Sequence, residues 1–418
     1  MSNQAKYDEK IKRLDDAIAM KEPDRVPCIP FVQTYGVTHN GSTMAQAMYD
    51  HTVAQKGIEE YLEKYDPDCS YGVSAYFCGL GPAFDDLGLQ FFQWAGQEGS
   101  VCDDNGIHQF HEKAYLEEDE YPTLLSDVTG WVLSRYLPRN YDIFKPLEGL
   151  HLNYNMLGYG SVPGLMQFAD PRIAETFAKL GEIARTKVIP VYQSWAEFDK
   201  RMVEKGYPLL FNSTTSVAFD LLSDCLRGTL DTMMDIVEQP ENVQAAIAAF
   251  YPGTLFGAIA QAKTSPGRLV FIPLHKGLEG FLSNEQYREF YWPTMLRLVE
   301  DLNKFGYTPY VYTEGKYDAR LEIIKDLPAG SCVVHFENCD MAEAKRLVGD
   351  HCCISGGFND QLLVRATPQK VADEVKRLLD ICAPGGGYMF DVNCTMDYGA
   401  KPENMEAMFE TVKEYGKY

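Results

Sequence analysis

The 418-residue sequence predicts a single α/β domain folded as a (β/α)8 TIM barrel. From residue 150 onward, short β-rich runs alternate regularly with helical segments, and two further β-rich runs lie near the N-terminus. Together they make about eight strand–helix units, as a barrel of this class requires. No repeat or low-complexity linker interrupts the pattern, so we expect one domain over residues 1–418.

The N-terminal part begins with a charged, amphipathic stretch, residues 1–22, that predicts a helix ended by the prolines after it. Residues 26–31 and 69–78 predict the first two barrel strands, with a helix over residues 44–65 between them. Residues 87–148 are rich in aromatic and acidic side chains and show no long helical period over most of their length. We expect this segment to form an extension of strands and loops over the barrel mouth.

The remaining strands and helices follow in alternation. The strands that we expect are residues 151–156, 208–212, 268–274, 307–313, 331–336, 352–355 and 388–392. The helices that we expect are residues 171–204, 217–234, 240–250, 285–305, 318–327, 342–348, 367–382 and 402–415. Pro190 predicts a kink or break in the first of these helices. Ser283 with Gln286 is typical of a capping box at a helix start.

The formal net charge of −22 argues against some classes of partner. An acidic surface repels phosphate backbones and anionic lipids, so we expect neither nucleic-acid nor membrane binding. No signal peptide is recognisable, and no apolar run approaches the ~18 residues of a membrane-spanning helix. The 11 cysteines are scattered and odd in number, as expected for free thiols in a reducing compartment. We therefore expect a cytoplasmic protein, and whether it forms a homo-oligomer stays open.

Three predicted strand ends carry residues that bind metals: Glu314, Cys353 and Cys394. Because the carboxyl ends of parallel strands meet at one rim, we expect these three side chains to converge. A carboxylate and two thiolates are zinc ligands, and three protein ligands leave a fourth position open for a substrate. The sequence therefore predicts a catalytic zinc site, with buried thiols as the simpler alternative for the two cysteines.

His275 follows another predicted strand and is the predicted catalytic residue at the same rim. A histidine there can donate a proton to a leaving oxyanion, hydrogen-bond the substrate or replace a zinc ligand, and a structural role is the alternative. Cys352 and Glu322 are further candidates for completing the zinc site. Glu322 falls within a predicted helix and points away from the strand ends, so Glu314 is preferred.

Aromatic side chains gather near the expected mouth, and four of them, Tyr35, Tyr76, Trp94 and Tyr312, are predicted to contact the substrate. His335, on a neighbouring strand, completes this predicted set. The rings suit an aromatic molecule in a largely apolar pocket, and a core or lid role is the alternative for each.

Several segments resemble the uroporphyrinogen decarboxylase superfamily, which includes corrinoid-dependent methyltransferases. The segments that carry the resemblance are Arg25-Val26-Pro27, Phe211 to Met234 with Pro240-Glu241, Asp340 to Asp350, Gly356 to Asp360, and Cys394 followed by Lys401 to Met405. They stand, in order, at the family's early Arg-x-Pro, its central strand and helix, its Asp-x-x-x-Ala-Lys-x-x-x-Gly helix, its Gly-Asn-x-Asp-Pro turn and its closing loop.

Two branches of the superfamily are distinguished by particular residues. The decarboxylases carry N-terminal arginines that hold a polycarboxylate substrate, and residues 31–36 contain none. The coenzyme M methyltransferases bind zinc through His-x-Cys and a later cysteine. Here Tyr312-Thr313-Glu314 stands at the first place and Cys394 at the second. With Cys353 as third ligand, the set is similar to the zinc sites of the first methyltransferases of anaerobic O-demethylase systems.

The resemblance implies a zinc-dependent methyltransferase. It would move a methyl group from a small methoxylated, aromatic substrate to the Co(I) corrinoid of a separate partner protein. The chain shows no Asp-x-His-x-x-Gly motif for holding a corrinoid of its own. The alternatives are a methylcobamide:thiol methyltransferase of the coenzyme M type, a uroporphyrinogen decarboxylase-like lyase, and a non-catalytic binding member of the superfamily.

Overall fold

A parallel sheet of six strands forms the centre of the molecule, as the barrel prediction requires. The computed structural model describes residues 2–74, 77–151, 157–396 and 398–418. In both spatial and chain order, the strands are β3 (Phe211–Thr214), β4 (Leu269–Leu274), β5 (Thr308–Lys316), β6 (Val333–Asn338), β7 (Cys353–Gly356) and β8 (Tyr388–Met389).

Two extended segments near the N-terminus complete the barrel between β8 and β3. The first bridges Phe390 in parallel through Cys28, and the second bridges Leu209 in parallel through Ser70. Both predicted N-terminal strands therefore lie in the barrel wall, but they pair only at isolated positions. In the first segment two prolines lack the N–H groups that a continuous ladder needs.

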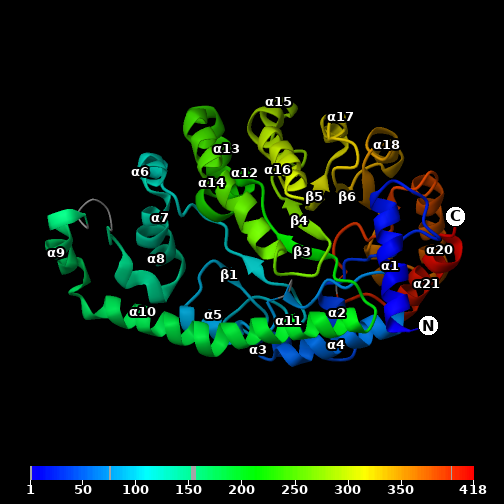
Figure 1. The fold of residues 1–418 in the computed structure, drawn as a ribbon, viewed down its shortest axis with the longest axis horizontal. Helices are drawn as coiled ribbons and strands as arrows, with labels where there is room; N and C mark the ends of the chain where they lie inside the picture. The colour runs from blue at the N-terminus through cyan, green and yellow to red at the C-terminus, as the bar shows by residue number, and fades with distance from the viewer. Residues whose placement is uncertain (1, 75–76, 152–156, 397) are drawn as a thin grey trace.

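Helices cover the outside of the barrel, with α12 to α18 along one side and α1, α20 and α21 along another (Figure 1). The Ser283 hydroxyl accepts a hydrogen bond from the backbone N–H of Gln286, so the predicted capping box is present. Most helices predicted after residue 205 are present apart from their ends. The helices of the barrel are α1 (Asn3–Ile18), α2 (Thr34–Thr38), α3 (Met44–Tyr49), α4 (His51–Tyr65), α12 (Ala218–Asp220), η9 (Leu221–Arg227), α13 (Thr229–Glu238), α14 (Pro240–Ala262), α15 (Asn284–Gln286), η10 (Tyr287–Tyr291), α16 (Trp292–Lys304), η11 (Asp318–Arg320), α17 (Leu321–Ile324), α18 (Met341–Leu347), α19 (Gln361–Arg365), α20 (Pro368–Cys382) and α21 (Pro402–Tyr415).

The predicted extension, residues 87–148, consists of loops and short strands in its first half, as expected, but its second half, from Glu118 to Leu147, is mostly helical. Among its described residues the strands are two-residue pieces, β1 (Phe92–Gln93) and β2 (Gln109–Phe110), which pair antiparallel. The prediction missed these helices because most are too short to show a 3.6-residue period, and the longest stretch, residues 128–140, has π-helical turns in its middle that disturb that period. The helices here are α5 (Gly81–Leu87), η2 (Glu118–Glu120), α6 (Tyr121–Ser126), α7 (Val128–Trp131), η3 (Val132–Tyr136), α8 (Leu137–Asn140) and η4 (Asp142–Leu147).

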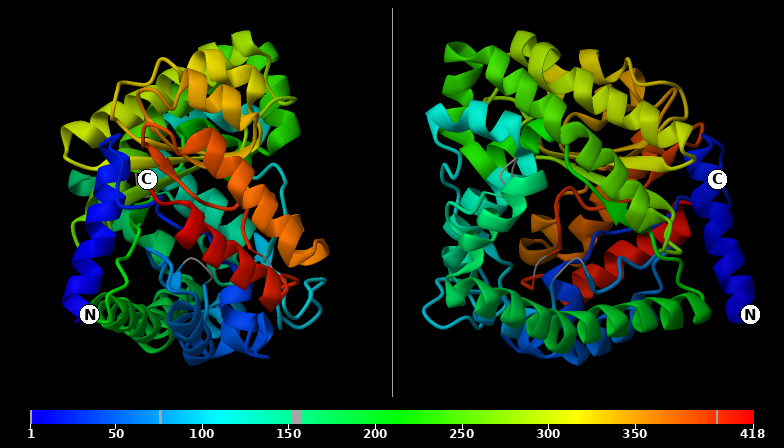
Figure 2. Two further views of the ribbon diagram at one scale, coloured as in Figure 1. Left: turned by 90° about the vertical axis from the view of Figure 1, so that its right-hand side faces the viewer. Right: turned by 60° about the vertical axis from the view of Figure 1, so that its left-hand side comes forward.

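Three short helical pieces follow the extension: η6 (Gly158–Gly160), α9 (Ser161–Gly164) and η7 (Leu165–Phe168). They lead into a long helical rod that runs along one edge of the molecule (Figures 1 and 2). The rod consists of α10 (Pro171–Ile183), η8 (Ala184–Val188) and α11 (Ile189–Glu204). The helix continues through Pro190 instead of breaking there, because the π-helical turns of η8 precede the proline and make room for its ring. The strand predicted over 151–156 falls on residues 152–156, outside the described residues.

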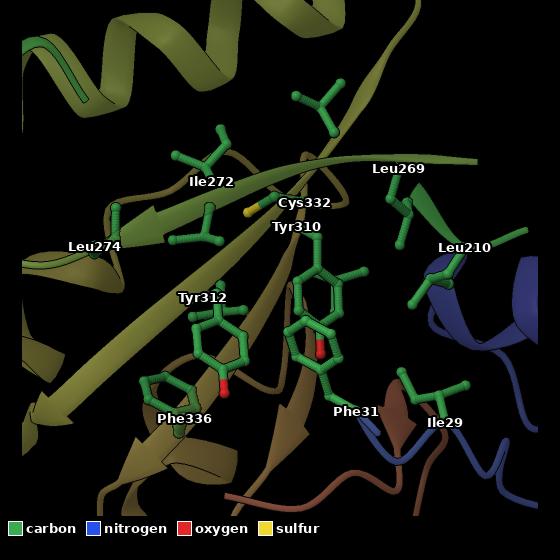
Figure 3. Packing of buried hydrophobic residues seen from close by; sticks show 14 of the residues in the cluster. Ile29, Phe31, Leu210, Leu269, Ile272, Leu274, Tyr310, Tyr312, Cys332 and Phe336 are labelled. Carbon is green, nitrogen blue, oxygen red and sulfur yellow. The ribbon is translucent and has the colours of Figure 1, made fainter. Parts of the chain in front are cut away.

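Aromatic rings fill the barrel interior. The rings of Phe211 and Phe271 lie 4.7 Å apart between centroids, and Phe211 packs at 5.3 Å against Tyr310. The ring of Phe31 lies 6.0 Å from that of Tyr312 on β5 between centroids, and Figure 3 shows both within this cluster. The interior is thus a packed core, so any substrate must bind at the rim.

Helix α14 corrects the expectation that no apolar stretch approaches membrane-spanning length. It has 23 residues, and its most apolar 18-residue window has a mean hydropathy of 1.4. Its side chains Val243, Ile247, Leu255 and Ile259 are buried in the core, and 44% of that window is buried. A core helix of a barrel satisfies the same length and composition, so α14 is weak evidence for a membrane span.

Candidate functional site

Four strand ends place polar side chains at one rim of the barrel. His275 directly follows β4, Glu314 and Glu337 lie near the ends of β5 and β6, and Cys394 follows β8. The side chains of His275 and Glu314 are 37% and 41% exposed, so a bound molecule can reach both. This rim is the candidate functional site.

The His275 ring lies between two carboxylates. Its Nδ1 atom is 2.5 Å from Oδ2 of Asp224, and its Nε2 atom is 3.6 Å from Oε1 of Glu314. Burial alone would lower the pKa of His275, but hydrogen bonds to Asp224 and Glu314 outweigh it and raise that pKa to about 11. Nδ1 is therefore committed to Asp224, while Nε2 faces Glu314 and the open rim.

Asp220 and Asp224 are functional candidates that the sequence analysis missed. The buried Asp220 carboxylate accepts hydrogen bonds from the backbone N–H groups of His275 and Lys276, each at 3.0 Å, and from the Tyr291 hydroxyl at 2.6 Å. Burial, aided by Asp224, raises the pKa of Asp220 to about 7. Burial would also raise the pKa of Asp224, but His275 and Lys276 outweigh it and lower that pKa. Asp220 and Asp224 are four residues apart on a predicted helix, which puts both carboxylates on one face. This spacing was the sequence signal that could have identified them.

The extension reaches this rim through Glu112. The Lys276 ammonium lies 3.1 Å from Oδ1 of Asp224 and 3.6 Å from Oε2 of Glu112. The Glu112 carboxylate also accepts a hydrogen bond from the backbone N–H of Thr229. Lys276 is 9% exposed, and these two carboxylates compensate its positive charge within the protein.

The other side of the rim holds Cys394, Glu337 and Tyr312. Burial, together with the nearby Glu337, raises the pKa of the half-buried Cys394 thiol to about 11. The Glu337 carboxylate accepts a hydrogen bond from the backbone N–H of Gly315. Burial and the nearby Cys394 raise the pKa of Tyr312 well above its usual value. The buried Tyr312 hydroxyl has no hydrogen-bond partner among the residues that the structure describes.

Cys353 does not reach this rim, which corrects the predicted zinc ligand set. It is the first residue of β7 and is in register with Val333 of β6, which in turn pairs with Tyr310 of β5. Glu314 lies four residues beyond Tyr310, which is about 13 Å along a strand. Cys353 is fully buried, and this burial raises its thiol pKa far above the usual value. The prediction placed the cysteine on the right strand but at the wrong end of it.

Cys352 and Glu322, the further candidates for completing the zinc site, lie no closer to the rim. Cys352 precedes β7, and its thiol donates to the carbonyl oxygen of Pro328 at 3.5 Å. Glu322 is on α17, where its side chain is 60% exposed and pairs with Lys325. The prediction that Glu322 points away from the strand ends is consistent with this position.

The predicted substrate-contacting residues are dispersed. Tyr35, on α2, is buried with its hydroxyl 2.9 Å from that of Tyr65. Trp94 is buried in a separate cluster with residues of the extension. Tyr76 lies outside the described residues. Of the described members, Tyr312 is the one beside the rim residue Glu314.

His335 is fully buried in a hydrogen-bonded network. Its Nδ1 atom lies 3.1 Å from the Tyr310 hydroxyl and 3.3 Å from Oδ2 of Asp391. Its Nε2 atom lies 2.9 Å from the carbonyl oxygen of Asn393. Both ring nitrogens are thus engaged within the protein, which fits a structural role better than the predicted contact with a substrate.

The rim carries side chains of the types that bind zinc, with His275 in the place predicted for Cys353. His275, Glu314 and Cys394 offer an imidazole nitrogen, a carboxylate and a thiolate, which are the donor types that zinc prefers. His275 is also held at its second nitrogen by a carboxylate, as metal-binding histidines usually are. Among the described residues, no three such side chains already surround a common point. His275 and Glu314 are therefore a preformed pair, and Cys394 is the candidate third donor.

Comparison with known proteins identifies relatives of one family. The uroporphyrinogen decarboxylase family model matches residues 141–415. Similar proteins include the uroporphyrinogen decarboxylases of Chromohalobacter salexigens (28% identical, covering 32% of this chain and 38% of that protein) and Pseudomonas fluorescens (32% identical, covering 32% and 38%). That of Neisseria meningitidis serogroup C is 25% identical, covering 52% and 55%. These matches span between 38% and 55% of the relatives' own lengths.

One solved structure matches nearly the whole chain. A methyltransferase from Methanosarcina mazei superposes with a TM-score of 0.59 and covers 96% of this chain and 98% of that one. The two sequences are 12% identical, so this match shows a shared fold.

Proposed function

The chain belongs to the uroporphyrinogen decarboxylase family, and we propose that within this family it is a methyltransferase, like the protein whose fold it shares over nearly its whole length. In this proposal it moves a methyl group from a small methoxylated, aromatic compound to the Co(I) corrinoid of a separate partner protein. The observation that carries the proposal is the preformed His275–Glu314 pair at an acidic rim that also holds Cys394.

The charge of the rim argues against decarboxylation of a polycarboxylate. Such a substrate needs unpaired arginine or lysine side chains around it. At this rim the carboxylates of Asp224, Glu314 and Glu337 lie near His275 and Lys276, and both of these are already paired with carboxylates. An uncharged ether avoids this repulsion, and the aromatic side chains beneath the rim favour an aromatic ring.

In the proposed enzyme, His275, Glu314 and Cys394 would hold zinc. When bound, zinc supplies Lewis-acid stabilisation of the negative charge that develops on an ether oxygen as its bond to the methyl carbon breaks. The electron pair of that bond stays on the oxygen. The Co(I) centre of the acceptor provides the pair that forms the new bond to the methyl carbon.

The chain's own residues bind and orient the substrate. His275 is fixed by Asp224, so its Nε2 atom stays directed to the rim. Glu112 holds part of the extension against Lys276 beside the rim. A corrinoid bound to a second protein must approach the methyl group from the side opposite the oxygen, which requires the mouth to admit that protein.

Metal analysis with methyl transfer assays tests the proposal. We expect stoichiometric zinc in the wild type and zinc loss in His275→Ala, Glu314→Ala and Cys394→Ala, with Cys353→Ala as the matched control that keeps it. The wild type is expected to methylate a reduced corrinoid protein from a panel of methoxyarenes, followed by the loss of Co(I) absorbance.

The outcomes distinguish between the possible functions. Full zinc retention in all three rim variants would refute the ligand assignment. Zinc binding without corrinoid methylation, but with methyl transfer from methyl-corrinoid to a thiol, would show the coenzyme M-type reaction instead. A protein without zinc or transfer activity would be a binding member of the family.

A further inference from the structure

Two aspartates on one turn of helix bind His275 and Lys276, the two residues that directly follow β4. Asp220 ends α12 and Asp224 lies in η9, four residues further on. Asp220 binds the backbone N–H groups of His275 and Lys276, each at 3.0 Å. Asp224 binds the side chains of the same two residues, with contacts of 2.5 Å and 3.1 Å. Asp220 therefore fixes the backbone of these two residues, and Asp224 fixes the orientation of their side chains.

The contact at Nδ1 determines what the other nitrogen can do. Asp224 occupies the Nδ1 edge of the ring at 2.5 Å, so Nε2 is the nitrogen directed to the rim, where Glu314 lies 3.6 Å away. A metal at the rim would therefore bind Nε2 in place of its proton. Without this carboxylate, the ring can rotate about its side-chain bonds and Nε2 is no longer held toward the rim.

We infer that Asp224 is a positioning residue that orients His275 for metal binding at the rim, and that Asp220 holds the loop that carries it. The inference rests on the proposed function for the identity of the metal. It assigns to Asp224 a role beyond its ion pair with Lys276, and to Asp220 a role beyond its hydrogen bonds to the backbone. Asp224 itself acts through His275 and contacts neither substrate nor acceptor.

The test is zinc affinity, measured on the full-length protein by competition with a chelator. Asp224→Asn is expected to weaken zinc binding about 10- to 100-fold, the usual effect of losing the carboxylate behind a metal-binding histidine. The matched control is Asp231→Asn, which removes an equally acidic residue nearby that pairs with Arg227 at 3.2 Å and has no contact with His275 in the structure. We expect its zinc affinity to equal that of the wild type.

A double variant distinguishes positioning from a general structural effect. In a His275→Ala background, Asp224→Asn is expected to cause no further loss of zinc affinity, because its effect passes through His275. Thermal unfolding of the metal-free variants checks that they are folded. Asp224→Ser replaces Asp224→Asn in every comparison if the asparagine variant fails to fold.

Three results would be decisive. Wild-type zinc affinity in folded Asp224→Asn would overturn the inference, as would an equal further loss in the His275→Ala background. Wild-type zinc affinity in His275→Ala would refute the ligand assignment. A wild type that binds zinc but transfers no methyl group, together with a weakened Asp224→Asn, would reject the proposed function and leave the positioning role standing.

Discussion

The ring of Tyr312 lies flat on the ring of His335, with centroids 4.1 Å apart and 10° between the planes. The two residues are in register on β5 and β6. Glu314 and Glu337 each lie two residues further along these strands, and both contribute to raising the pKa of Tyr312, so they lie near its hydroxyl. The stacked rings therefore lie directly beneath the rim.

Tyr312→Phe is predicted to leave the free energy of unfolding unchanged or raise it by about 1 kcal/mol, because it removes a buried hydroxyl without a described partner. Chemical denaturation measures this. The matched variant is Tyr310→Phe, whose hydroxyl donates to Asp391 at 2.9 Å, and we expect it to cost about 1–3 kcal/mol. An equal loss in both variants would mean that the Tyr312 hydroxyl has a partner in solution.

His335→Ala is predicted to lower the free energy of unfolding by about 3 kcal/mol, because it removes a fully buried ring and leaves the hydrogen-bonding groups around it without partners. If the variant folds, the KM for the methyl donor should equal that of the wild type. A raised KM with wild-type stability would instead support the predicted contact between His335 and the substrate.

Cys353→Ala is predicted to keep the zinc content of the wild type and to cost about 1 kcal/mol of stability, since it removes one buried sulfur atom at the start of β7. Cys394→Ala, the matched variant at the rim, should lose zinc with little change in the stability of the metal-free protein. Zinc analysis and denaturation of both variants measure this. Loss of zinc from Cys353→Ala alone would reinstate Cys353 as a ligand.

Asp68→Asn is predicted to lower the free energy of unfolding at pH 7 by about 3–5 kcal/mol, because it leaves buried cations unpaired. The Asp68 carboxylate lies 2.6 Å from Nη1 of Arg13 on α1 and 2.7 Å from Nη1 of Arg25 in the barrel wall. Burial alone would raise the pKa of Asp68, but Arg25 and Arg13 outweigh it and lower that pKa.

The Asp68 carboxylate also makes the free energy of unfolding depend on pH. Because the folded-state pKa is lowered, the ionised carboxylate stabilises the fold above the unfolded-state value of about 3.9, and this contribution is lost as the pH falls through the lower folded-state pKa. The stabilities of the wild type and Asp68→Asn should therefore converge in acid. Asp8→Asn, on the exposed face of α1, is the control with no expected difference. A constant gap between wild type and Asp68→Asn at all pH values would contradict this account.

Local sequence patterns were sufficient to predict the barrel and several of the residues at its rim. Hydrophobic runs and helical periods depend on neighbouring residues, so they located all six strands of the sheet within a few residues. Once the strands were placed, the convergence of their carboxyl ends was enough to bring His275, Glu314 and Cys394 to one rim. The helices of the extension were missed because most are too short to repeat a pattern and the stretch over residues 128–140 contains a π-helical segment that shifts it.

The tertiary structure alone decided which side chains meet. Asp224 and His275 are 51 residues apart in the chain, and no local pattern encodes their contact. The same holds for Cys353, whose distance from Glu314 depends on the register between strands and not on the strand it occupies. Register and side-chain pairing arise from packing between distant segments, whereas a strand or a helix is already favoured by its own residues.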